Sequence, residues 1–317
     1  MVKIDLITGF LGSGKTSFLK LYAKWLVSKG HNICILENDY GPINVDMLAI
    51  DELRGPNCEV EMVSGSNDMD CHRRRFRTKL IQMAMSGYDY VLVEPSGIYD
   101  TDEFFDALHE DPIADWYTIG NVITVVDAGL TDSLSRESRY VLTSESANSG
   151  IIIMSKVQLA SPGADKHTKD IINSTMLEFD CDRKITDDDI LAKNWKELTE
   201  DDFTRINSCG YKYADHIKLQ VMDSNDYDSM FFMNEGLVID KDELIKRAGS
   251  LIGNGPAGHV IRIKGTVKDL RGSFTAINLT EKESEISTVK NGMDILIVIG
   301  EDIDKDKIRK VITGGKE

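Results

Sequence analysis

The stretch VKIDLITGFLGSGKTS, residues 2–17, joins a short apolar run to a glycine-rich segment that ends in a lysine and two hydroxyl residues. Glycine, four residues, glycine, lysine and a hydroxyl residue, after a strand and before a helix, form the phosphate-binding loop pattern. Gly9, Gly12 and Gly14 allow backbone N–H groups to turn inward around phosphate oxygens, next to the positive end of the following helix. A glycine-rich turn with a surface lysine is the alternative, which this strand and helix context disfavours.

The side chains that follow the glycines predict how a nucleoside triphosphate is held. We expect Lys15 to reach the β- and γ-phosphates, Thr16 to place its hydroxyl on Mg²⁺, and Ser17 to reach the α-phosphate. The backbone of Ser13, between two of the glycines, belongs to the same cradle. The loop therefore predicts binding and hydrolysis of a triphosphate, with Lys15 also in a catalytic role.

The composition argues against several classes of function. Lysine and arginine number 37 against 53 aspartate and glutamate, a net charge of −16, which disfavours nucleic acid and anionic membranes as partners. No apolar run reaches the roughly 18 residues of a membrane span, and the first residues carry no signal-peptide pattern. The five cysteines are odd in number and scattered, so we expect reduced thiols in a cytoplasmic protein. The oligomeric state stays open.

Short apolar runs alternate with segments of helical spacing over the first part of the chain. Runs that are almost continuously apolar indicate strands buried on both faces of a parallel sheet. We therefore predict a doubly wound, mainly parallel α/β domain of the P-loop NTPase type over residues 1–205, with ligands beyond the carboxyl ends of its strands. The predicted strands are residues 3–8, 32–38, 89–95, 121–128 and 150–156.

The pattern changes in the last third of the chain, where apolar strand-like segments outnumber helical ones. This change predicts a second, smaller α+β domain over residues 206–317, with a mainly antiparallel sheet and helices on one face. Two domains also agree with a length of 317 residues at about 150 residues per domain.

A second carboxylate for the metal is expected in YDYVLVEPSG, residues 88–97. Glu94 ends an apolar strand, where P-loop NTPases place a carboxylate near Mg²⁺. Gly97 follows three residues later, and we expect its backbone N–H to sense the γ-phosphate, so that the following segment moves when that phosphate leaves. The alternative for Glu94 is a strand-end charge that reaches solvent.

The segment ENDYG, residues 37–41, follows another predicted strand and offers Glu37 and Asp39 on the phosphate side of the sheet. Either carboxylate is a candidate to orient the attacking water or to hold a metal. An Asn-Asp turn before a helix would give the same pattern, because these residues also favour turns and caps. Both interpretations stay open on sequence alone.

Four motifs, GFLGSGKT, ENDYG, VEPSG and ITVVDA, resemble in order and spacing those of the CobW family of P-loop GTPases, relatives of UreG and HypB. GHVIRIKGTV and DILIVIGEDIDKDKIRKVI look like the C-terminal domain of that family. The resemblance implies Mg²⁺-dependent hydrolysis of GTP by a switch that assists the handling of a metal or corrinoid cofactor. It also implies a client metalloenzyme or corrinoid protein as partner.

The resemblance further implies a metal-binding C-x-C-C cluster after a glycine, here Gly65. Ser66, Asp68 and Met69 stand at the three cysteine positions, and only Cys71, displaced toward the next helix, remains as a thiol. Zinc and copper(I) prefer thiolate and imidazole ligands, so affinity for such metals is expected to fall at this segment.

Two interpretations remain for this segment. A mixed site for a transition metal would use Asp68, Cys71 and His72, with Asp70 and Glu37 as further ligands. Consecutive residues rarely all point at one ion, so we favour a polar helix N-terminus without a metal.

The second departure lies in the segment that recognises the base. Family GTPases carry N-K-x-D, and this chain has Ser155, Lys156, Val157 and Gln158. Lys156 keeps the role of packing along the base, but the Gln158 amide replaces a carboxylate that would accept both guanine donors. The neutral pair costs about 1 to 3 kcal/mol of guanine preference. ATP is therefore an alternative to GTP.

We expect, from the family resemblance, a nucleoside triphosphatase in metal or corrinoid handling. The alternative is a nucleotide-dependent chaperone or regulator of a metalloenzyme that carries no metal itself and uses either GTP or ATP. Replacement of the cysteine cluster favours this alternative.

Overall fold

The chain forms two compact units, Met1–Leu219 and Gln220–Glu317. The division suggested by the sequence, between residues 205 and 206, falls inside helix α7 (Glu200–Asn207) of the first unit. The computed structural model describes residues 1–10, 12–39, 50–64, 69–97, 99–218, 228–233, 236–281, 284–289, 292 and 294–315.

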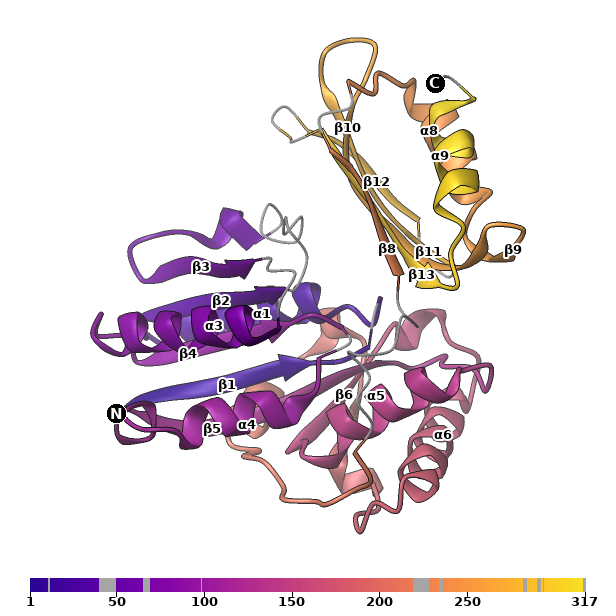
Figure 1. The fold of residues 1–317 in the computed structure, drawn as a ribbon. Coiled ribbons are helices and arrows are strands. Elements are labelled where there is room, and N and C mark those ends of the chain that lie inside the picture. Colours follow the sequence, from indigo (N-terminus) through magenta and orange to yellow (C-terminus); the bar gives the residue numbers. More distant parts are fainter. Residues whose placement is uncertain are drawn as a thin grey trace. The chain divides into compact units, whose positions relative to one another are not determined.

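The first unit contains a seven-stranded sheet with the order β3-β2-β4-β1-β5-β6-β7 (Figure 1). Every neighbouring pair in it is parallel. The prediction of a doubly wound parallel sheet is confirmed. The strands are β1 (Val2–Thr8), β2 (Ile33–Asp39), β3 (Cys58–Ser64), β4 (Tyr90–Pro95), β5 (Tyr117–Asp127), β6 (Ile151–Ser155) and β7 (Ile190–Ala192).

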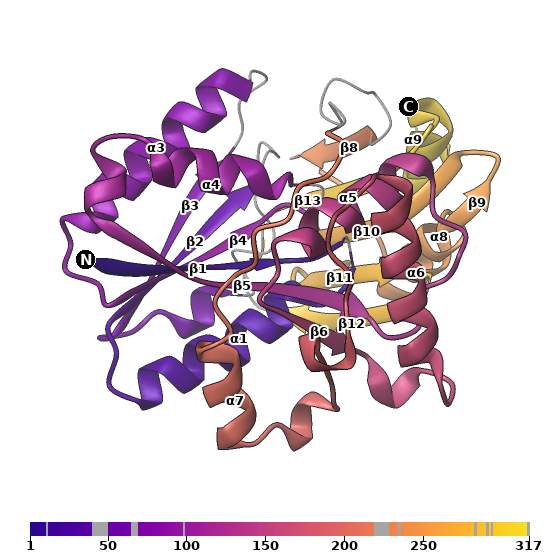
Figure 2. The ribbon, with the colours of Figure 1, turned by 90° about the horizontal axis from the view of Figure 1, so that it is seen from below.

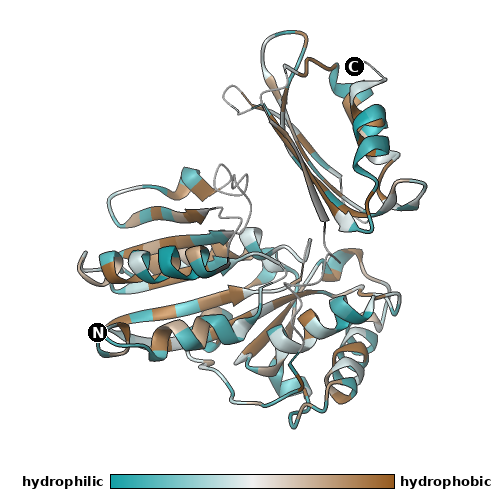
Figure 3. Ribbon diagram, in the orientation of Figure 1, coloured by the Kyte–Doolittle hydropathy of each residue, from teal (hydrophilic) through white to brown (hydrophobic). Residues whose placement is uncertain are grey.

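Helices cover both faces of this sheet (Figure 2). α1 and α7 pack on one face, and α3, α4, α5 and α6 pack on the other. The central strands are mostly apolar because helices cover both of their faces, and brown predominates over teal along them in Figure 3. The remaining helices are α1 (Lys15–Ser28), α3 (Met69–Ala84), α4 (Thr101–His109), α5 (Arg136–Ala147) and α6 (Ala164–Glu178).

Two edge strands, β3 and β7, were not predicted from sequence. In β3, the partly exposed Glu59 and Glu61 alternate with the buried Cys58 and Val60, so no continuous apolar run marks the strand. β7 has only three residues. Short or half-exposed edge strands give a weaker hydrophobic signal than central ones.

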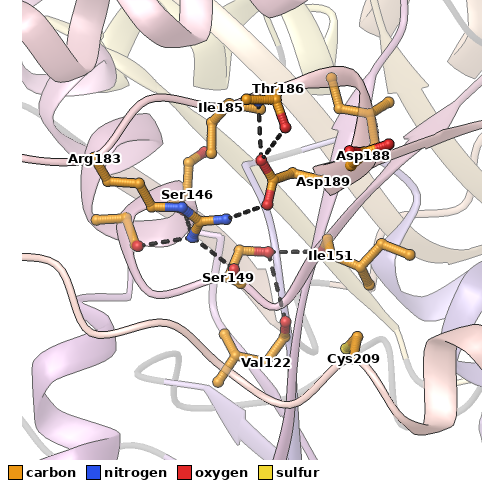
Figure 4. A network of polar contacts seen from close by, with 12 residues as sticks. Val122, Ser146, Ser149, Ile151, Arg183, Ile185, Thr186, Asp188, Asp189 and Cys209 are labelled. Carbon is orange, nitrogen blue, oxygen red and sulfur yellow. Dashed lines mark hydrogen bonds and ion pairs between the residues drawn. The ribbon is translucent and has the colours of Figure 1, made fainter.

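Arg183 fixes the C-terminal end of α5 to the segment that leads into β7 (Figure 4). Its guanidinium donates to the carbonyl oxygens of Ser146, Ala147 and Ser149, at 3.3, 2.9 and 2.6 Å. It also bonds the Asp189 carboxylate at 2.9 Å. The last carbonyls of a helix lack partners within the helix, so this arginine holds the end of α5 in place.

The second unit contains a six-stranded sheet with the order β12-β11-β10-β13-β8, and β9 pairs with β10. Its strand pairs are antiparallel, and α8 and α9 lie on one face (Figure 1), as predicted. Buried and partly exposed residues alternate along β11, as in a sheet with one covered face. The elements are β8 (Asp228–Met233), α8 (Lys241–Gly249), β9 (Gly253–Gly255), β10 (Gly258–Lys268), β11 (Phe274–Thr280), β12 (Ser284–Val289), β13 (Ile295–Glu301) and α9 (Lys305–Thr313).

Candidate nucleotide site

The loop between β1 and α1 has a backbone that requires glycine. Gly9, Gly12 and Gly14 have φ angles of 144°, 75° and 95°, in the region that residues with a Cβ rarely adopt. A Cβ at Gly9 would also overlap the carbonyl oxygen of Val125. The backbone of the loop therefore requires glycine at these positions of the motif.

Lys15 begins α1 and turns back into this loop. The side chain is only 7% exposed, and its Nζ donates to the carbonyl oxygen of Gly9 at 2.6 Å. Gly14 occupies the N-cap position of α1, so no side chain caps the first N–H groups of the helix. An ammonium group and uncapped helix N–H groups at one place form an anion-binding arrangement.

Thr16 and two buried glutamates lie next to each other at the same edge of the sheet. The Thr16 hydroxyl donates to Glu94 Oε1 at 2.7 Å. Glu94 on β4 and Glu37 on β2 are paired in register, and both are buried. Both carboxylates face the α1 side, because Ile35 and Leu92, two residues before them, pack in the α1 core.

These side chains fit a magnesium ion. A hydroxyl and carboxylates are hard oxygen ligands, which Mg²⁺ prefers. Thr16 and Glu94 would hold the ion, and Glu37 lies beside Glu94 in the next strand. Asp39 is the last residue of β2, and its side chain lies outside the described part of the structure.

The expected transition-metal ligands lie elsewhere. His72 Nε2 is 2.8 Å from Asn38 Oδ1, and Asn38 follows Glu37 in β2, so its side chain points to the opposite face of the sheet. The structure therefore does not bring His72 together with Glu37. Cys71 is partly exposed on α3 and Asp70 is exposed.

The remaining ligand proposed for that site, Asp68, lies outside the described residues. Within the residues that the structure describes, no three His, Cys, Asp or Glu side chains are grouped to hold a metal. α3 begins at Met69 with Asp70 in its first turn.

The segment expected to bind the base lies against the loop. Lys156 follows β6 with a φ of 57°, and its Nζ donates to the carbonyl oxygen of Gly12 at 2.8 Å. The same Nζ lies 3.4 Å from Asp127 at the end of β5. Ser155 is buried and Gln158 is exposed, so the Gln158 amide is accessible to a ligand.

Gly97 and Ser17, which were both predicted to contact phosphates, differ in their exposure to solvent. Gly97 is buried just after β4, whereas Ser17 is exposed in the first turn of α1. Ser13 is buried, and its backbone N–H donates to Phe10 at 3.1 Å, which closes the turn of the loop.

The family model for the CobW/HypB/UreG nucleotide-binding domain matches residues 3–179, more than half of the chain. The chain belongs to the CobW/HypB/UreG family. Membership in this family indicates an NTP-hydrolysing enzyme. The matched region includes the loop, the glutamates on β2 and β4, and the base segment.

Individual relatives of this CobW/HypB/UreG chain are distant. Zinc-regulated GTPase metalloprotein activator 1 of Schizosaccharomyces pombe is 23% identical over 190 residues, which are 58% of this chain and 45% of that protein. Zn(II)-bound YjiA GTPase from E. coli is 16% identical and covers 100% of this chain and 99% of its own, with a TM-score of 0.39. HypB from Archaeoglobus fulgidus is also 16% identical, covering 65% of this chain and 86% of its own, with a TM-score of 0.39.

Two residues next to the loop of this CobW/HypB/UreG chain were not identified from the sequence. The first is Trp195 in η5 (Trp195–Glu197), directly after the last strand of the sheet. Its ring meets Phe18 edge-on, with centroids 5.8 Å apart. A Cβ added to Gly14 would lie 3.1 Å from the indole Cη2. No sequence signal marked Trp195, because the short strand β7 that precedes it was not predicted either.

The second missed residue is Glu145 on α5, which is fully buried. The Thr8 hydroxyl donates to its Oε1 at 3.2 Å, and the backbone N–H of Gly9 bonds to it as well. Burial raises the pKa of Glu145 to about 8, against the opposing effects of Lys15 and these hydrogen bonds. A glutamate in the polar stretch TSESA gives no sign of burial in the sequence.

The described part of this CobW/HypB/UreG chain has no helix with both the length and the apolar character to cross a membrane.

Proposed function

We propose that this protein is a Mg²⁺-dependent nucleoside triphosphatase that favours GTP and acts as a switch in metal or corrinoid cofactor handling for a partner protein. The observation that carries the proposal is the hydrogen bond of 2.7 Å between Thr16 and Glu94, next to the Lys15 ammonium in the loop. A lysine for phosphates and a hydroxyl–carboxylate pair for Mg²⁺ are the parts that P-loop phosphoryl transfer requires.

Each residue of the site has a role in the proposed hydrolysis. The loop backbone and Lys15 would bind the β- and γ-phosphates, and Lys15 would exchange its bond to Gly9 for phosphate oxygens. Thr16 and Glu94 would hold Mg²⁺, which neutralises charge on the transferring phosphoryl group when bound. A carboxylate among Glu37, Asp39 and Glu94 would orient the attacking water.

The segment after β4 is the proposed switch. Gly97 would sense the γ-phosphate, and Asp100 follows at the N-cap of α4. Asp100 accepts hydrogen bonds from the Ser144 hydroxyl at 2.9 Å and the Tyr140 hydroxyl at 3.0 Å, both on α5. Movement of this segment would therefore be transmitted to α5.

The base is proposed to lie over Lys156, with Gln158 at its polar edge. The Lys156 bond to Gly12 joins the base segment to the phosphate loop, and the exposed Gln158 amide offers one donor group and one acceptor to a purine. GTP is favoured by the family, and ATP is the alternative because a glutamine also pairs with adenine.

A second candidate function is a nucleotide-dependent chaperone or regulator of a metalloenzyme that carries no metal itself. Two observations favour it. Ser66, Asp68 and Met69 replace the cysteines of the resembling family, and His72 is bonded to Asn38 on the sheet face opposite Glu37. In either case we propose a client metalloenzyme or corrinoid protein in the cytoplasm, because relatives of this chain include a metalloprotein activator and a hydrogenase maturation factor.

The experiment compares nucleotide binding, phosphate release and metal content of the purified protein with Mg²⁺ and either GTP or ATP. Lys15→Ala should weaken nucleotide binding at least about a hundredfold because it removes the ammonium from the phosphates. Lys24→Ala, which changes a lysine on the same helix that is 62% exposed, should leave binding unchanged. Equal turnover by wild type and Lys15→Ala would refute the proposed triphosphatase.

Metal analysis of the same samples separates the two candidate functions. A metal carrier should hold close to one transition-metal ion per chain, in an amount that changes with nucleotide. A regulator should hydrolyse nucleotide without retaining metal.

A further inference from the structure

A fully buried carboxylic acid lies directly beneath the phosphate loop. Glu145 has no exposed surface and comes from α5, on the sheet face opposite the two glutamates of the candidate magnesium site. Its Oε1 accepts from the Thr8 hydroxyl at 3.2 Å. Its Oε2 is buried and has no hydrogen-bond partner among the residues that the structure describes. A buried carboxylate with an unbonded oxygen is costly, whereas a neutral carboxyl group is much less so.

Glu145 and Lys15 act on the same residue of the loop. The Gly9 N–H bonds to Glu145, and the Gly9 carbonyl accepts from Lys15 Nζ at 2.6 Å. Thr8, which bonds Glu145 through its hydroxyl, is the last residue of β1. The carboxyl group therefore supports the first turn of the loop from below, while the lysine contacts it from the ligand side.

Hydrogen bonds hold the backbone of α5 at Glu145 and just after it. Its own carbonyl oxygen accepts from the Thr124 hydroxyl at 2.5 Å. The next two residues of α5, Ser146 and Ala147, have their carbonyls bonded to Arg183 (Figure 4). The α5 backbone that carries Glu145 is thus bonded to β5 and to Arg183.

Lys15 on α1 is the charged group that acts electrostatically on Glu145 among the residues described. On the α4 side, the Asp100 carboxylate is bonded to Ser144 and Tyr140, and β1 and β5 present the hydroxyls of Thr8 and Thr124. Burial raises the pKa of Glu145 to about 8 even though Lys15 lowers it. The carboxyl group is therefore mostly neutral at pH 7.

We propose that Glu145 is a positioning residue that links phosphate binding to the uptake of a proton: its neutral form supports the loaded loop, and its ionised form opposes the phosphates. This inference rests on the proposed nucleotide function. A carboxylate below the loop would repel the phosphates through a medium of low dielectric constant.

Phosphate binding and protonation would therefore strengthen each other. When Lys15 pairs with phosphate, its positive charge no longer offsets the ionised Glu145 carboxyl, and the phosphates add negative charge nearby. By linkage, a ligand that raises the pKa of a group takes up protons on binding, and its affinity falls as the pH rises above that pKa.

The test is calorimetric titration of the full chain with Mg²⁺ and GTP at pH 7, 8 and 9, in pairs of buffers with different ionisation enthalpies. Wild type should bind about tenfold more weakly at pH 9 than at pH 7, and should take up about half a proton near pH 8. Glu145→Gln keeps an oxygen acceptor but cannot ionise, so both effects should disappear. Glu137→Gln, a partly exposed glutamate of the same helix, should behave as wild type.

The ionisation of the nucleotide is common to all variants and cancels in the comparison. The same pH profile and proton uptake in wild type and Glu145→Gln would overturn the inference. Absence of proton uptake in wild type would also overturn it, without reliance on any variant. Failure of the nucleotide function looks different, since wild type would then bind neither GTP nor ATP at any pH.

Discussion

The hydroxyl of Thr16, in the first turn of α1, donates a hydrogen bond of 2.7 Å to the carboxylate of Glu94 at the end of β4. The two residues are 78 positions apart in the chain, and the parallel sheet brings them together because β1 and β4 are neighbours. Their contact joins the phosphate loop, through the residue after Lys15, to the strand that leads into the proposed switch segment. The first prediction tests this pair.

Thr16→Ala should raise the Mg²⁺ concentration needed for half-maximal hydrolysis by about tenfold or more. The substitution removes a hydroxyl ligand and leaves the buried Glu94 carboxylate without that donor. A Mg²⁺ titration of phosphate release measures the effect. Thr78→Ala is the control, because Thr78 is exposed on α3 and its hydroxyl bonds the Arg74 carbonyl of the same helix. An unchanged Mg²⁺ requirement in Thr16→Ala would show that the metal does not bind at this hydroxyl.

Gln158→Asp should increase the preference for GTP over ATP by about tenfold to a hundredfold. The new carboxylate would accept both guanine donors in place of a neutral amide, and position 158 is exposed and thus accessible to the base. Competition between the two nucleotides gives the ratio directly. If the ratio is the same in wild type and variant, the base does not contact this residue.

Trp195→Ala should weaken nucleotide binding and lower the free energy of unfolding by about 2 kcal/mol or more, because the indole packs on Phe18 beside Gly14 of the loop. Trp195→Phe keeps an aromatic ring and should restore much of both. Urea unfolding and nucleotide titration measure the two effects. Full nucleotide affinity in Trp195→Ala would show that this ring does not support the loop.

Glu145→Gln should stabilise the protein at neutral and alkaline pH. The native state holds the Glu145 proton up to a pKa of about 8, whereas the unfolded chain loses it at an ordinary carboxyl pKa, so the native state binds more protons between these values. The stability of wild type therefore falls as the pH rises across this window. Urea unfolding at pH 5, 6.5 and 8 should give a difference between variant and wild type that grows with pH. A constant difference would contradict the shifted pKa.

The central sheet and the loop could be predicted from sequence because their signals are local. β1, β4 and β6 are buried on both faces, so each reads as an apolar run. The loop needs glycines at fixed spacing, and in the structure those glycines have positive φ angles. Lys15 and Thr16 follow directly from that spacing, and the structure places them at the start of α1, with bonds to Gly9 and Glu94.

Contacts between distant segments could not be predicted in the same way. Glu37 and Asn38 are adjacent in the chain but face opposite sides of β2, so His72, which bonds Asn38, does not reach Glu37. The burial of Glu145 depends on β1, β5 and the loop packing around α5. Neither relationship has a local pattern, because each is created by the tertiary fold.

The three hydrogen bonds that Arg183 donates to backbone carbonyls limit how far this chain can be truncated from its C-terminal end. The family model ends at residue 179, so a fragment cut there would lose the guanidinium that closes α5, and with it β7 and the Trp195 ring. Asn207 accepts a hydrogen bond from Lys3 at 2.9 Å, which anchors still later residues to the first strand. The smallest fragment worth expressing on its own therefore extends past α7.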